Sequence, residues 1–338
     1  MSVGERAALP GTAIPVLNHI ITWADRWDHF QARWGVRRSL HRVPPGLYAL
    51  GTPTSESPVF VTANYTLSVD AVRSSLKGVD AFLLVLDTHG INVWCAAGKG
   101  TFGTDELVRR IETVGLKDVV THRKLILPQL GAPGVAAFDV KRLSGFQVEY
   151  GPVRAADLPE YLRSGRATPE MRRVRFTLSD RLVLIPVEIV QTFLPMLAAA
   201  VVLYLAAGLW PAIGVIVAVL AGVVAFPILL PWLPTQAFSS KGFILGLIVA
   251  LPVAAAARRD GAREALWFGV GWAVALVAAM PAVTAYLALN FTGSTTFTSK
   301  TGVELEMRKY IPIMAVLGGL GLVVGLILIV VRLIGGLS

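Results

Sequence analysis

The sequence predicts an α/β domain followed by an all-α polytopic transmembrane domain of about five helices. The charged residues divide the chain, because residues 1–182 carry 23 of the 31 Lys and Arg and 17 of the 22 Asp and Glu. The first part alternates short apolar runs with amphipathic stretches, which is typical of a parallel sheet wrapped by helices. The second part contains five apolar stretches near the ~20 residues that a bilayer requires. We therefore expect an N-terminal amphipathic segment (1–45), an α/β domain (46–165), a basic linker (166–182) and a transmembrane domain (183–338).

The N-terminal segment is rich in tryptophan and arginine. Ile20, Trp23, Trp27 and Phe30 recur at helical spacing, which predicts an amphipathic helix. We expect this helix to cover the soluble core, with contact to a membrane surface as the alternative. Met1 to Gly11 lacks the apolar core of a signal peptide.

The α/β domain is expected to contain several strands and helices in alternation. Strands are predicted over 58–62, 81–87, 119–121, 125–128 and 146–151. Helices are predicted after Tyr65 as far as Leu76, and over 104–114, 138–143 and 158–162, with Thr104 as the N-cap of the second. Loops that follow parallel strands meet at one sheet edge, and open α/β sheets bind ligands there.

The run Asn92 to Thr101 follows one of these strands and contains Cys95, the single cysteine of the chain. A single cysteine cannot form an internal disulfide or a site of several thiolates. Asn92 is suited to cap a short helix that Gly98 would end. A buried structural cysteine is the alternative to a functional one.

The segment NVWCAAGKGTFGT closely resembles the cap-helix motif of the mercury-methylating corrinoid protein family (HgcA). That family is related to the large subunit of the corrinoid iron–sulfur protein of the acetyl-CoA pathway. The segments VTANY, LILPQLGAPGVAA and GPVRA also resemble segments of the family. The resemblance implies a Rossmann-like corrinoid-binding domain, in which Cys95 is the lower axial ligand of cobalt and the base of the cofactor is displaced (base-off). It implies cofactor-binding positions at Thr62, Ala63, Asn64, Asn92, Val93, Trp94, Cys95, Ala96, Ala97, Gly98, Lys99, Gly100, Thr101, Gln129, Gly131, Ala132 and Gly151.

The resemblance further implies a corrinoid-dependent methyltransferase. It would carry a methyl group on cobalt from a methyltetrahydrofolate-linked donor to mercury(II), giving methylmercury. With one cysteine the chain has no iron–sulfur cluster of its own, so cobalt would be re-reduced by an external ferredoxin-like protein with 4Fe–4S clusters. Two alternatives are a membrane-bound corrinoid methyl carrier of one-carbon metabolism with another acceptor, and a non-enzymatic thiol sensor or transporter.

Two other patterns point to different chemistry. Asp87-Thr88-His89 resembles the Asp-x-His motif of a different cobalamin fold, in which the histidine binds cobalt. That motif requires glycine where this chain has Asn92, so we expect His89 to be a surface residue. The basic residues are scattered and accompany no nucleic-acid motif, so no nucleic-acid partner is expected; an anionic lipid surface is the expected neighbour.

The membrane spans are predicted over 183–206, 211–232, 242–257, 265–289 and 311–333, with kinks at Pro227, Pro231 and Pro252. The basic linker places the α/β domain on the cytoplasmic side of the inner membrane by the positive-inside rule. Lys241, Lys300, Arg308 and Lys309 agree with this orientation, whereas Arg258, Arg259 and Arg263 do not. A re-entrant third span would remove the conflict. The hydroxyl-rich loop 290–299 resembles a family motif and is either a solvated turn or a contact with the α/β domain or the substrate path.

Overall fold

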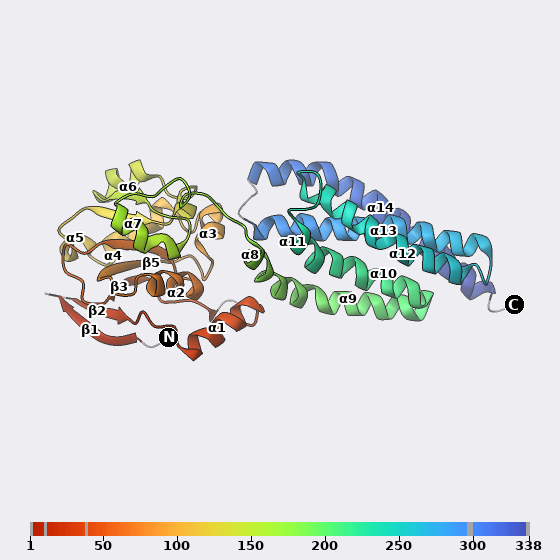
Figure 1. Cartoon of the computed structure of the whole chain (residues 1–338), viewed down its shortest axis with the longest axis horizontal. Coiled ribbons are helices and arrows are strands. Elements are labelled where there is room, and N and C mark those ends of the chain that lie inside the picture. Colours follow the sequence, from red (N-terminus) through yellow and green to blue (C-terminus); the bar gives the residue numbers. More distant parts are fainter. Residues whose placement is uncertain (1–2, 10–11, 38–39, 296–299, 336–338) are drawn as a thin grey trace. The chain divides into compact units, whose positions relative to one another are not determined.

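The computed structural model describes residues 3–9, 12–37, 40–295 and 300–335. The chain divides into two compact units, Met1–Arg175 and Phe176–Ser338. The first unit is a mixed α/β domain and the second is helical (Figure 1). This confirms the predicted fold class of an α/β domain with a parallel sheet followed by a helical region.

The α/β unit is built on a seven-stranded sheet with the order β1-β2-β3-β5-β4-β6-β7. Strands β5, β4, β6 and β7 run parallel, in register from Val59↔Phe82 to Ala63↔Leu86 between β4 and β5. β3 is antiparallel to β5, and β1 is antiparallel to β2. The strand bounds are β1 Val3–Leu9, β2 Thr12–Leu17, β3 Gly46–Leu50, β4 Val59–Ala63, β5 Ala81–Leu86, β6 Lys124–Leu127 and β7 Gln147–Tyr150.

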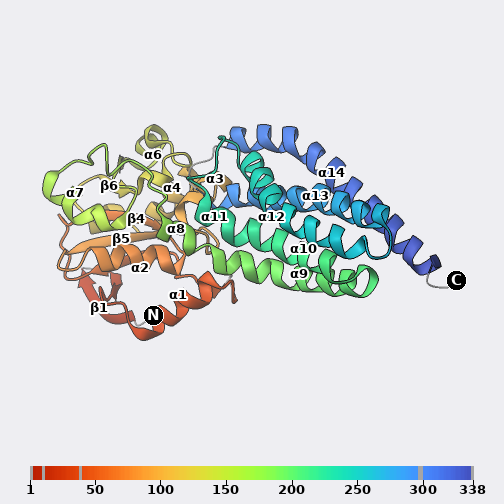
Figure 2. The same cartoon turned by 45° about the vertical axis from the view of Figure 1, so that its right-hand side comes forward.

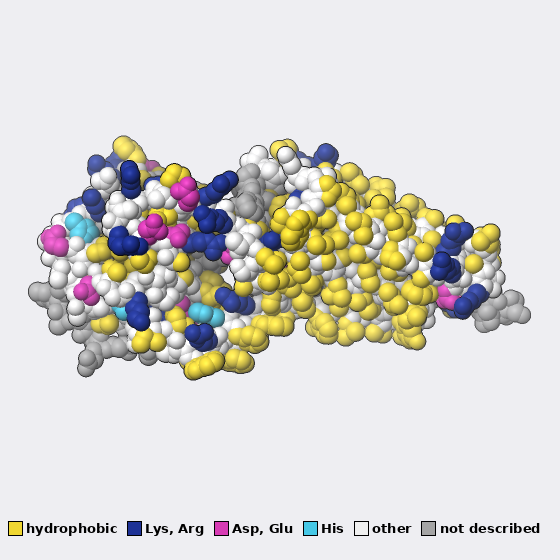
Figure 3. Space-filling view, viewed as in Figure 1, with side chains coloured by type: hydrophobic (Ala, Val, Ile, Leu, Met, Phe, Trp, Pro, Cys, Tyr) yellow, Lys and Arg dark blue, Asp and Glu magenta, His cyan; other side chains and the backbone are white. Residues whose placement is uncertain are grey.

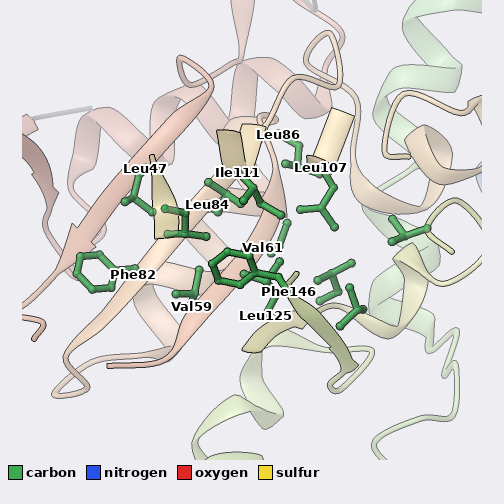
Figure 4. Close-up of a cluster of buried hydrophobic side chains, with 14 of the residues drawn as sticks. Leu47, Val59, Val61, Phe82, Leu84, Leu86, Leu107, Ile111, Leu125 and Phe146 are labelled. Atoms are coloured by element: carbon green, nitrogen blue, oxygen red, sulfur yellow. The ribbon is translucent and has the colours of Figure 1, made fainter. Parts of the chain in front are cut away.

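The two faces of the sheet are buried under different helices, because successive side chains of a strand point to opposite faces. Phe82, Leu84 and Leu86 of β5 join one core, which Leu107 and Ile111 of α4 cover (Figure 4). Leu83 and Val85 join the other core, with Val69 of α2. All six residues of β5 are buried, which explains why an uninterrupted apolar run marked this strand in the sequence.

The helices of this unit lie on both sides of the sheet (Figure 2). Their bounds are α1 Trp23–Arg33, α2 Thr66–Ser75, α3 Val93–Lys99, α4 Thr104–Thr113, α5 Leu116–Val119, α6 Ala137–Ser144 and α7 Leu158–Ser164, with 3-10 turns η2 Gln129–Gly131 and η3 Ala155–Asp157. The strand predicted over 119–121 is wrong, because α5 occupies Leu116–Val119 after Gly115, whose φ of 59° starts a new turn. The N-cap of α4 is Gly103 rather than Thr104, whose hydroxyl accepts a hydrogen bond from the N–H of Ala136 instead.

Three N-terminal strands were not predicted. β1 and β2 form an antiparallel pair, and β2 pairs in parallel with β3 through Val16↔Ala49 and Leu17↔Leu50. These strands therefore extend the sheet beyond β5. The short run Gly46–Leu50 shows no alternation of apolar and polar residues, and long-range pairing with β5 is what makes it a strand.

The predicted N-terminal helix forms as α1, but it does not cover the core with its aromatic side chains. Trp23 is 86% exposed and Trp27 is 61% exposed, whereas Asp25 and Ala32 are buried. The polar face of the helix contacts α2 through an ion pair of Asp25 with buried Arg73 and through a contact of His29 with buried Asp70. The expected contact with the soluble core is therefore made by the polar face of the helix, and the aromatic residues stay outside.

The helical unit contains five helices that are long and apolar enough to cross a membrane. Hydrophobic side chains cover most of its visible face (Figure 3). The helix bounds are α8 Leu178–Leu182, α9 Ile185–Ala207, α10 Leu209–Leu220, the π-helix Ala221–Ala225, α11 Phe226–Leu229, α12 Phe238–Gly261, α13 Leu266–Asn290, the 3-10 turn Phe291–Ser294 and α14 Lys300–Gly335.

The third span is longer than predicted. α12 is a continuous helix of 24 residues, so the short span over 242–257 is wrong in length and the re-entrant alternative gains no support. Gly242 and Gly246 allow it to pack closely on α13, since a Cβ at either position would lie 2.6 Å from the Cα of Ala285 or Pro281. Part of the hydroxyl-rich loop over 290–299 lies outside the described residues, at positions 296–299.

Candidate functional site

The carboxyl ends of β4, β5 and β6 bring three of the predicted loops to one edge of the sheet. β4 and β5 end in register at Ala63 and Leu86. The loop after β6 joins the loop after β7, where the N–H of Gln129 donates to the carbonyl of Pro152 at 3.2 Å. A Cβ at Gly134 would lie 3.0 Å from the Cα of Ala97, so the loop after β6 also contacts α3. The structure therefore confirms the prediction that these loops lie together at one edge of the sheet.

Helix α3 presents Cys95 at this edge. The side-chain oxygen of Asn92 accepts a hydrogen bond from the N–H of Cys95 at 2.9 Å, which makes Asn92 the N-cap. The helix ends at Lys99, because Gly100 takes the left-handed conformation with a φ of 83°, two residues later than the end predicted at Gly98. Ala96 and Ala97 turn into the core, whereas Cys95 and Trp94 are half-buried. Cys95 therefore lies on the outward side of α3, and the alternative of a buried core cysteine is wrong.

The loop that leads from β5 to α3 is held by Asn64 at the end of β4. Its side-chain oxygen accepts hydrogen bonds from the N–H of Thr88 at 3.1 Å and of Gly90 at 2.9 Å. Its amide nitrogen donates to Asp87 at 3.2 Å. Asn64 is buried, and its side chain forms hydrogen bonds with the loop rather than with a ligand.

A second contact fixes the same loop from α4. The N–H of Asp87 donates to Glu106 at 2.8 Å, and the guanidinium of Arg110 donates to the same oxygen of Glu106 at 2.8 Å. The start of α4 and the end of β5 are therefore joined by a hydrogen-bonded acid. This arrangement limits the freedom of the segment that carries Cys95.

Close packing fixes the other side of α3. Phe102 is buried directly after the helix, and a Cβ at Gly131 would lie 2.5 Å from its ring. A Cβ at Gly134 would lie 2.2 Å from the carbonyl oxygen of Phe102. Gly131 and Gly134 therefore serve the contact between the loop after β6 and α3, because a larger residue does not fit.

Gln129 is held at the edge by the linker. Its side-chain oxygen accepts a hydrogen bond from Arg172 at 2.7 Å. Nearby in the chain, the hydroxyl of buried Tyr161 donates to Glu149 at 2.6 Å. Burial, reinforced by the Glu149 carboxylate, raises the pKa of Tyr161 well above its ordinary value, so this phenol remains a hydrogen-bond donor throughout the physiological range.

The predicted site residues divide by exposure. Those exposed or half-buried, and so open to a ligand, are Asn92, Trp94, Cys95, Gly98, Lys99, Gly100, Thr101, Gln129 and Ala132. Those buried, and so able to act through packing, are Thr62, Ala63, Asn64, Val93, Ala96, Ala97, Gly131 and Gly151. A Cβ at Gly98 or Gly100 would meet nothing within 4 Å, which leaves the C-terminal end of α3 open.

His89 lies on the surface of the loop, as expected. It is exposed and has a φ of 57°, and its N–H donates to Asp87 at 3.1 Å. Within the part of the chain that the structure describes, no group of three or more His, Cys, Asp or Glu could hold a metal ion. Cys95 therefore belongs to no such cluster among the described residues.

Sequence reasoning missed several residues that shape this edge: Asp87, Thr88, Phe102, Glu106, Gly134 and Arg172. Thr88 and Asp87 directly follow an apolar strand, and that position could have marked them. The partners of Glu106 and Arg172 lie 19 and 43 residues away, so no local pattern marks them.

The α/β unit is similar in sequence to several known proteins. Residues 36–162 match the family model of the CO dehydrogenase/acetyl-CoA synthase delta subunit, CdhD. The chain is 36% identical over 127 residues to the acetyl-CoA decarbonylase/synthase complex subunit gamma of Methanopyrus kandleri. The aligned residues are 37% of this chain and 27% of that subunit. The chain is 29% identical over 129 residues to the corrinoid/iron-sulfur protein large subunit of Moorella thermoacetica, covering 38% and 28% respectively.

The similarity is confined to one part of each protein. This chain spans about a quarter of the length of these curated relatives. The family match begins three residues after α1, ends within α7 and includes the Cys95 loop, whereas the helical unit lies outside it. The α/β unit is therefore similar to part of an acetyl-CoA decarbonylase/synthase subunit and to part of a corrinoid/iron-sulfur protein large subunit.

Proposed function

We propose that the α/β unit binds a cobalamin-type corrinoid and carries a methyl group on it, with Cys95 as the lower axial ligand of cobalt. The observation that carries the proposal is the position of Cys95, which is half-buried on the outward side of an Asn92-capped helix at the carboxyl edge of the sheet. The similarity of residues 36–162 to a corrinoid/iron-sulfur protein large subunit supports the cofactor class.

The residues at this edge fit such a cofactor. The open space beside Gly98 and Gly100 suits the approach of a large flat ring, since no side chain fills it. The thiolate of Cys95 is a soft ligand that a cobalt centre accepts. Trp94, Lys99, Thr101, Gln129 and Ala132 are the accessible side chains that would hold the ring, and the buried residues would keep their segments in place.

A corrinoid, when bound, supplies a cobalt atom that accepts a methyl group and gives it up to an acceptor. The thiolate of Cys95 would be the residue that holds the metal, and it is a stronger electron donor than a neutral imidazole. Such a donor would favour transfer of the methyl group with its electron pair to an electrophilic metal ion, after which two electrons from an external donor would be needed before the next methyl group is accepted. We therefore propose mercury(II) as the acceptor and a methyltetrahydrofolate-linked molecule as the donor, with the base of the cofactor displaced.

Cys95 needs rigid support to perform this role. Asn92 fixes the first turn of α3, and Asn64 and Glu106 fix the loop before it. Because Cys95 is the single cysteine, an external ferredoxin-like protein with 4Fe–4S clusters would supply the electrons that keep cobalt reduced. We propose that this partner meets the α/β unit in the cytoplasm.

The membrane and its orientation belong to the same proposal. The five long apolar helices support a multi-pass membrane protein, and we propose the inner membrane with the α/β unit on the cytoplasmic side. Exposed Arg166, Arg173 and Arg175 of the linker favour this side. Arg181 does not contribute, because it is buried and donates to the carbonyls of Pro227 and Ile228 at 2.8 Å. Basic residues lie at both ends of α12, so this helix does not discriminate between orientations.

The test is an anaerobic comparison of wild type with Cys95→Ala and Cys95→His. Wild type loaded with methylcobalamin should show a sulfur–cobalt bond by X-ray absorption and should produce methylmercury from mercury(II). Cys95→Ala should lose both, and Cys95→His should restore cofactor binding without wild-type transfer. Full methylmercury production by Cys95→Ala, or a protein that stays colourless after reconstitution, would overturn the proposal.

A second candidate keeps the corrinoid and changes the acceptor. The similarity to acetyl-CoA decarbonylase/synthase gamma subunits favours a methyl carrier of one-carbon metabolism. The two candidates differ in an acceptor assay with the loaded full-length protein. Faster methyl transfer to a thiol or to an acetyl-CoA-forming enzyme than to mercury(II) would favour the second.

A further inference from the structure

We propose that α1 lies on an anionic lipid surface, with its row of aromatic side chains in the headgroup region. This proposal does not depend on the corrinoid. Trp23, Trp27, Phe30 and Trp34 are spaced four, three and four residues apart, so they share one face of the helix. All four are exposed, and hydrophobic side chains gather over α1 in Figure 3.

The opposite face of α1 fixes the direction in which this row points. Asp25 is ion-paired with Arg73 at 2.8 Å, and His29 contacts Asp70 at 2.7 Å. Both Arg73 and Asp70 are buried in α2. The helix cannot turn its aromatic residues inward without breaking these contacts, and buried Arg73 would then lose one of its two carboxylate partners. The contacts with α2 therefore fix the aromatic face of α1 on the outside of the α/β unit.

The aromatic side chains also form a preassembled surface. The rings of Trp27 and Phe30 stack with centroids 5.3 Å apart, and those of Phe30 and Trp34 lie 5.6 Å apart. Tryptophan prefers the membrane–water interface, because its ring is apolar and its N–H is polar. Three tryptophans on one exposed helix face match this environment better than bulk water.

Charge identifies the lipid as anionic. Arg26, Arg33 and Arg37 are exposed in and directly after α1, and the guanidinium of Arg26 lies 5.9 Å from the Trp23 ring. The two acids of the helix contact other partners, because Asp25 pairs with buried Arg73 and Asp28 lies 2.7 Å from buried His41. An aromatic face bordered by arginines is complementary to acidic headgroups, and the long apolar helices of the same chain supply a nearby bilayer.

The lipid surface would also be close to the edge that carries Cys95. The segment after α1 crosses that edge, since the N–H of Val43 donates to the carbonyl of Asn64 at 2.8 Å and that of Thr66 donates to the carbonyl of His41 at 3.1 Å. His41 in turn contacts Asp28 of α1. Docking of α1 on lipid would therefore hold this edge of the α/β unit beside the membrane surface.

The test measures the depth of α1 by spin labelling of the full chain, with one copy per nanodisc. Cys95→Ser removes the native thiol, and Ile20→Cys carries a nitroxide at the border of the aromatic row, where Ile20 is 62% exposed. Phe138→Cys on α6, where Phe138 is 78% exposed, is the matched control. In nanodiscs of phosphatidylcholine with phosphatidylglycerol, the label at position 20 should be accessible to oxygen and protected from a water-soluble nickel chelate, whereas the label at position 138 should show the reverse.

Two further variants attribute the result to the named residues. Trp23→Ser with Trp27→Ser should return the label at position 20 to water. Removing one arginine, as in Arg26→Gln, should lower the ratio of docked to undocked α1 about fivefold in anionic nanodiscs, since a basic residue near such a surface contributes ~1 kcal/mol. The same substitution should have a smaller effect in nanodiscs of pure phosphatidylcholine. A label at position 20 as accessible to nickel as the control would overturn the proposal. So would a label shielded from both reagents, because a protein surface would then cover α1, or protection that survives the two tryptophan substitutions.

Discussion

The side-chain oxygen of Asn64 accepts a hydrogen bond from the N–H of Thr88 at 3.1 Å and lies 2.8 Å from the hydroxyl of the same residue. This contact joins the end of β4 to the loop that precedes α3. Both residues are buried, so no solvent replaces the bond when it is lost. The position of Cys95 therefore depends on a residue 31 positions earlier in the chain.

Asn64→Ala should destabilise this loop. The N–H groups of Thr88 and Gly90 would lose their acceptor, and a buried polar group without a partner costs ~1–3 kcal/mol. Hydrogen–deuterium exchange should become faster in peptides covering 86–101. The exposed Asn18 provides the control, as Asn18→Ala should leave these peptides unchanged. Equal exchange in Asn64→Ala and wild type would show that the loop does not depend on this contact.

Asn92→Ala should weaken α3 itself. The substitution removes the acceptor for the N–H of Cys95, and loss of an N-cap costs ~1 kcal/mol. We expect reduced corrinoid retention on gel filtration, together with faster amide exchange over 93–99. Asn92→Ser retains a capping oxygen and should behave nearly as wild type. If serine and alanine weaken retention equally, the side chain of Asn92 acts on the ligand rather than as a cap.

Gly134→Ala and Gly98→Ala should have opposite effects. A Cβ at Gly134 would lie 2.2 Å from the carbonyl oxygen of Phe102, so the loop must move away from α3, at a cost of ~1–3 kcal/mol. A Cβ at Gly98 meets nothing within 4 Å, and alanine stabilises a helix interior by ~1 kcal/mol relative to glycine. Thermal unfolding of the full chain in detergent should show a lower midpoint for the first variant and an equal or higher one for the second. A lower midpoint for both would contradict the packing described for α3.

The attachment of α1 should be sensitive to acid. Desolvation alone would raise the pKa of Asp25, but hydrogen bonds from Thr22 and Arg73 outweigh it and hold the pKa below the ordinary value. Ionised Asp25 therefore stabilises the fold above its unfolded pKa of ~3.9, and this contribution is lost as the pH falls through the lower folded value. A nitroxide at position 20 should become progressively more mobile as the pH falls from ~3.9 through the lower folded pKa of Asp25.

Asp25→Asn should loosen α1 at neutral pH, by about 3 kcal/mol as for loss of one partner of a buried pair. Asp70 would still pair with Arg73, which places the cost at the low end of the usual range. The exposed pair of Arg142 and Asp139 gives a control, since Asp139→Asn should change stability by less than ~1 kcal/mol. An acid response of the label that Asp25→Asn leaves unchanged would assign it to another group.

Several features of the chain were already determined by local sequence. The apolar run predicted as a buried strand over 81–87 forms β5, Asn92 was recognisable as a cap, and five apolar stretches of bilayer length marked the helical unit. These predictions rest on hydrophobic periodicity and hydrogen bonding between residues close in sequence, which is why they hold without knowledge of the fold.

The tertiary structure decided the rest, because the deciding partners lie far apart in the chain. β3 is a strand because it pairs with β5. Asn64 holds a loop rather than facing a ligand, because its side-chain oxygen accepts hydrogen bonds from the N–H groups of Thr88 and Gly90. The amphipathic pattern of α1 predicted two faces but not which one turns inward. Buried Arg73 and Asp70 decide it, since an ion pair in the interior must be kept whole, and the aromatic face is left outside.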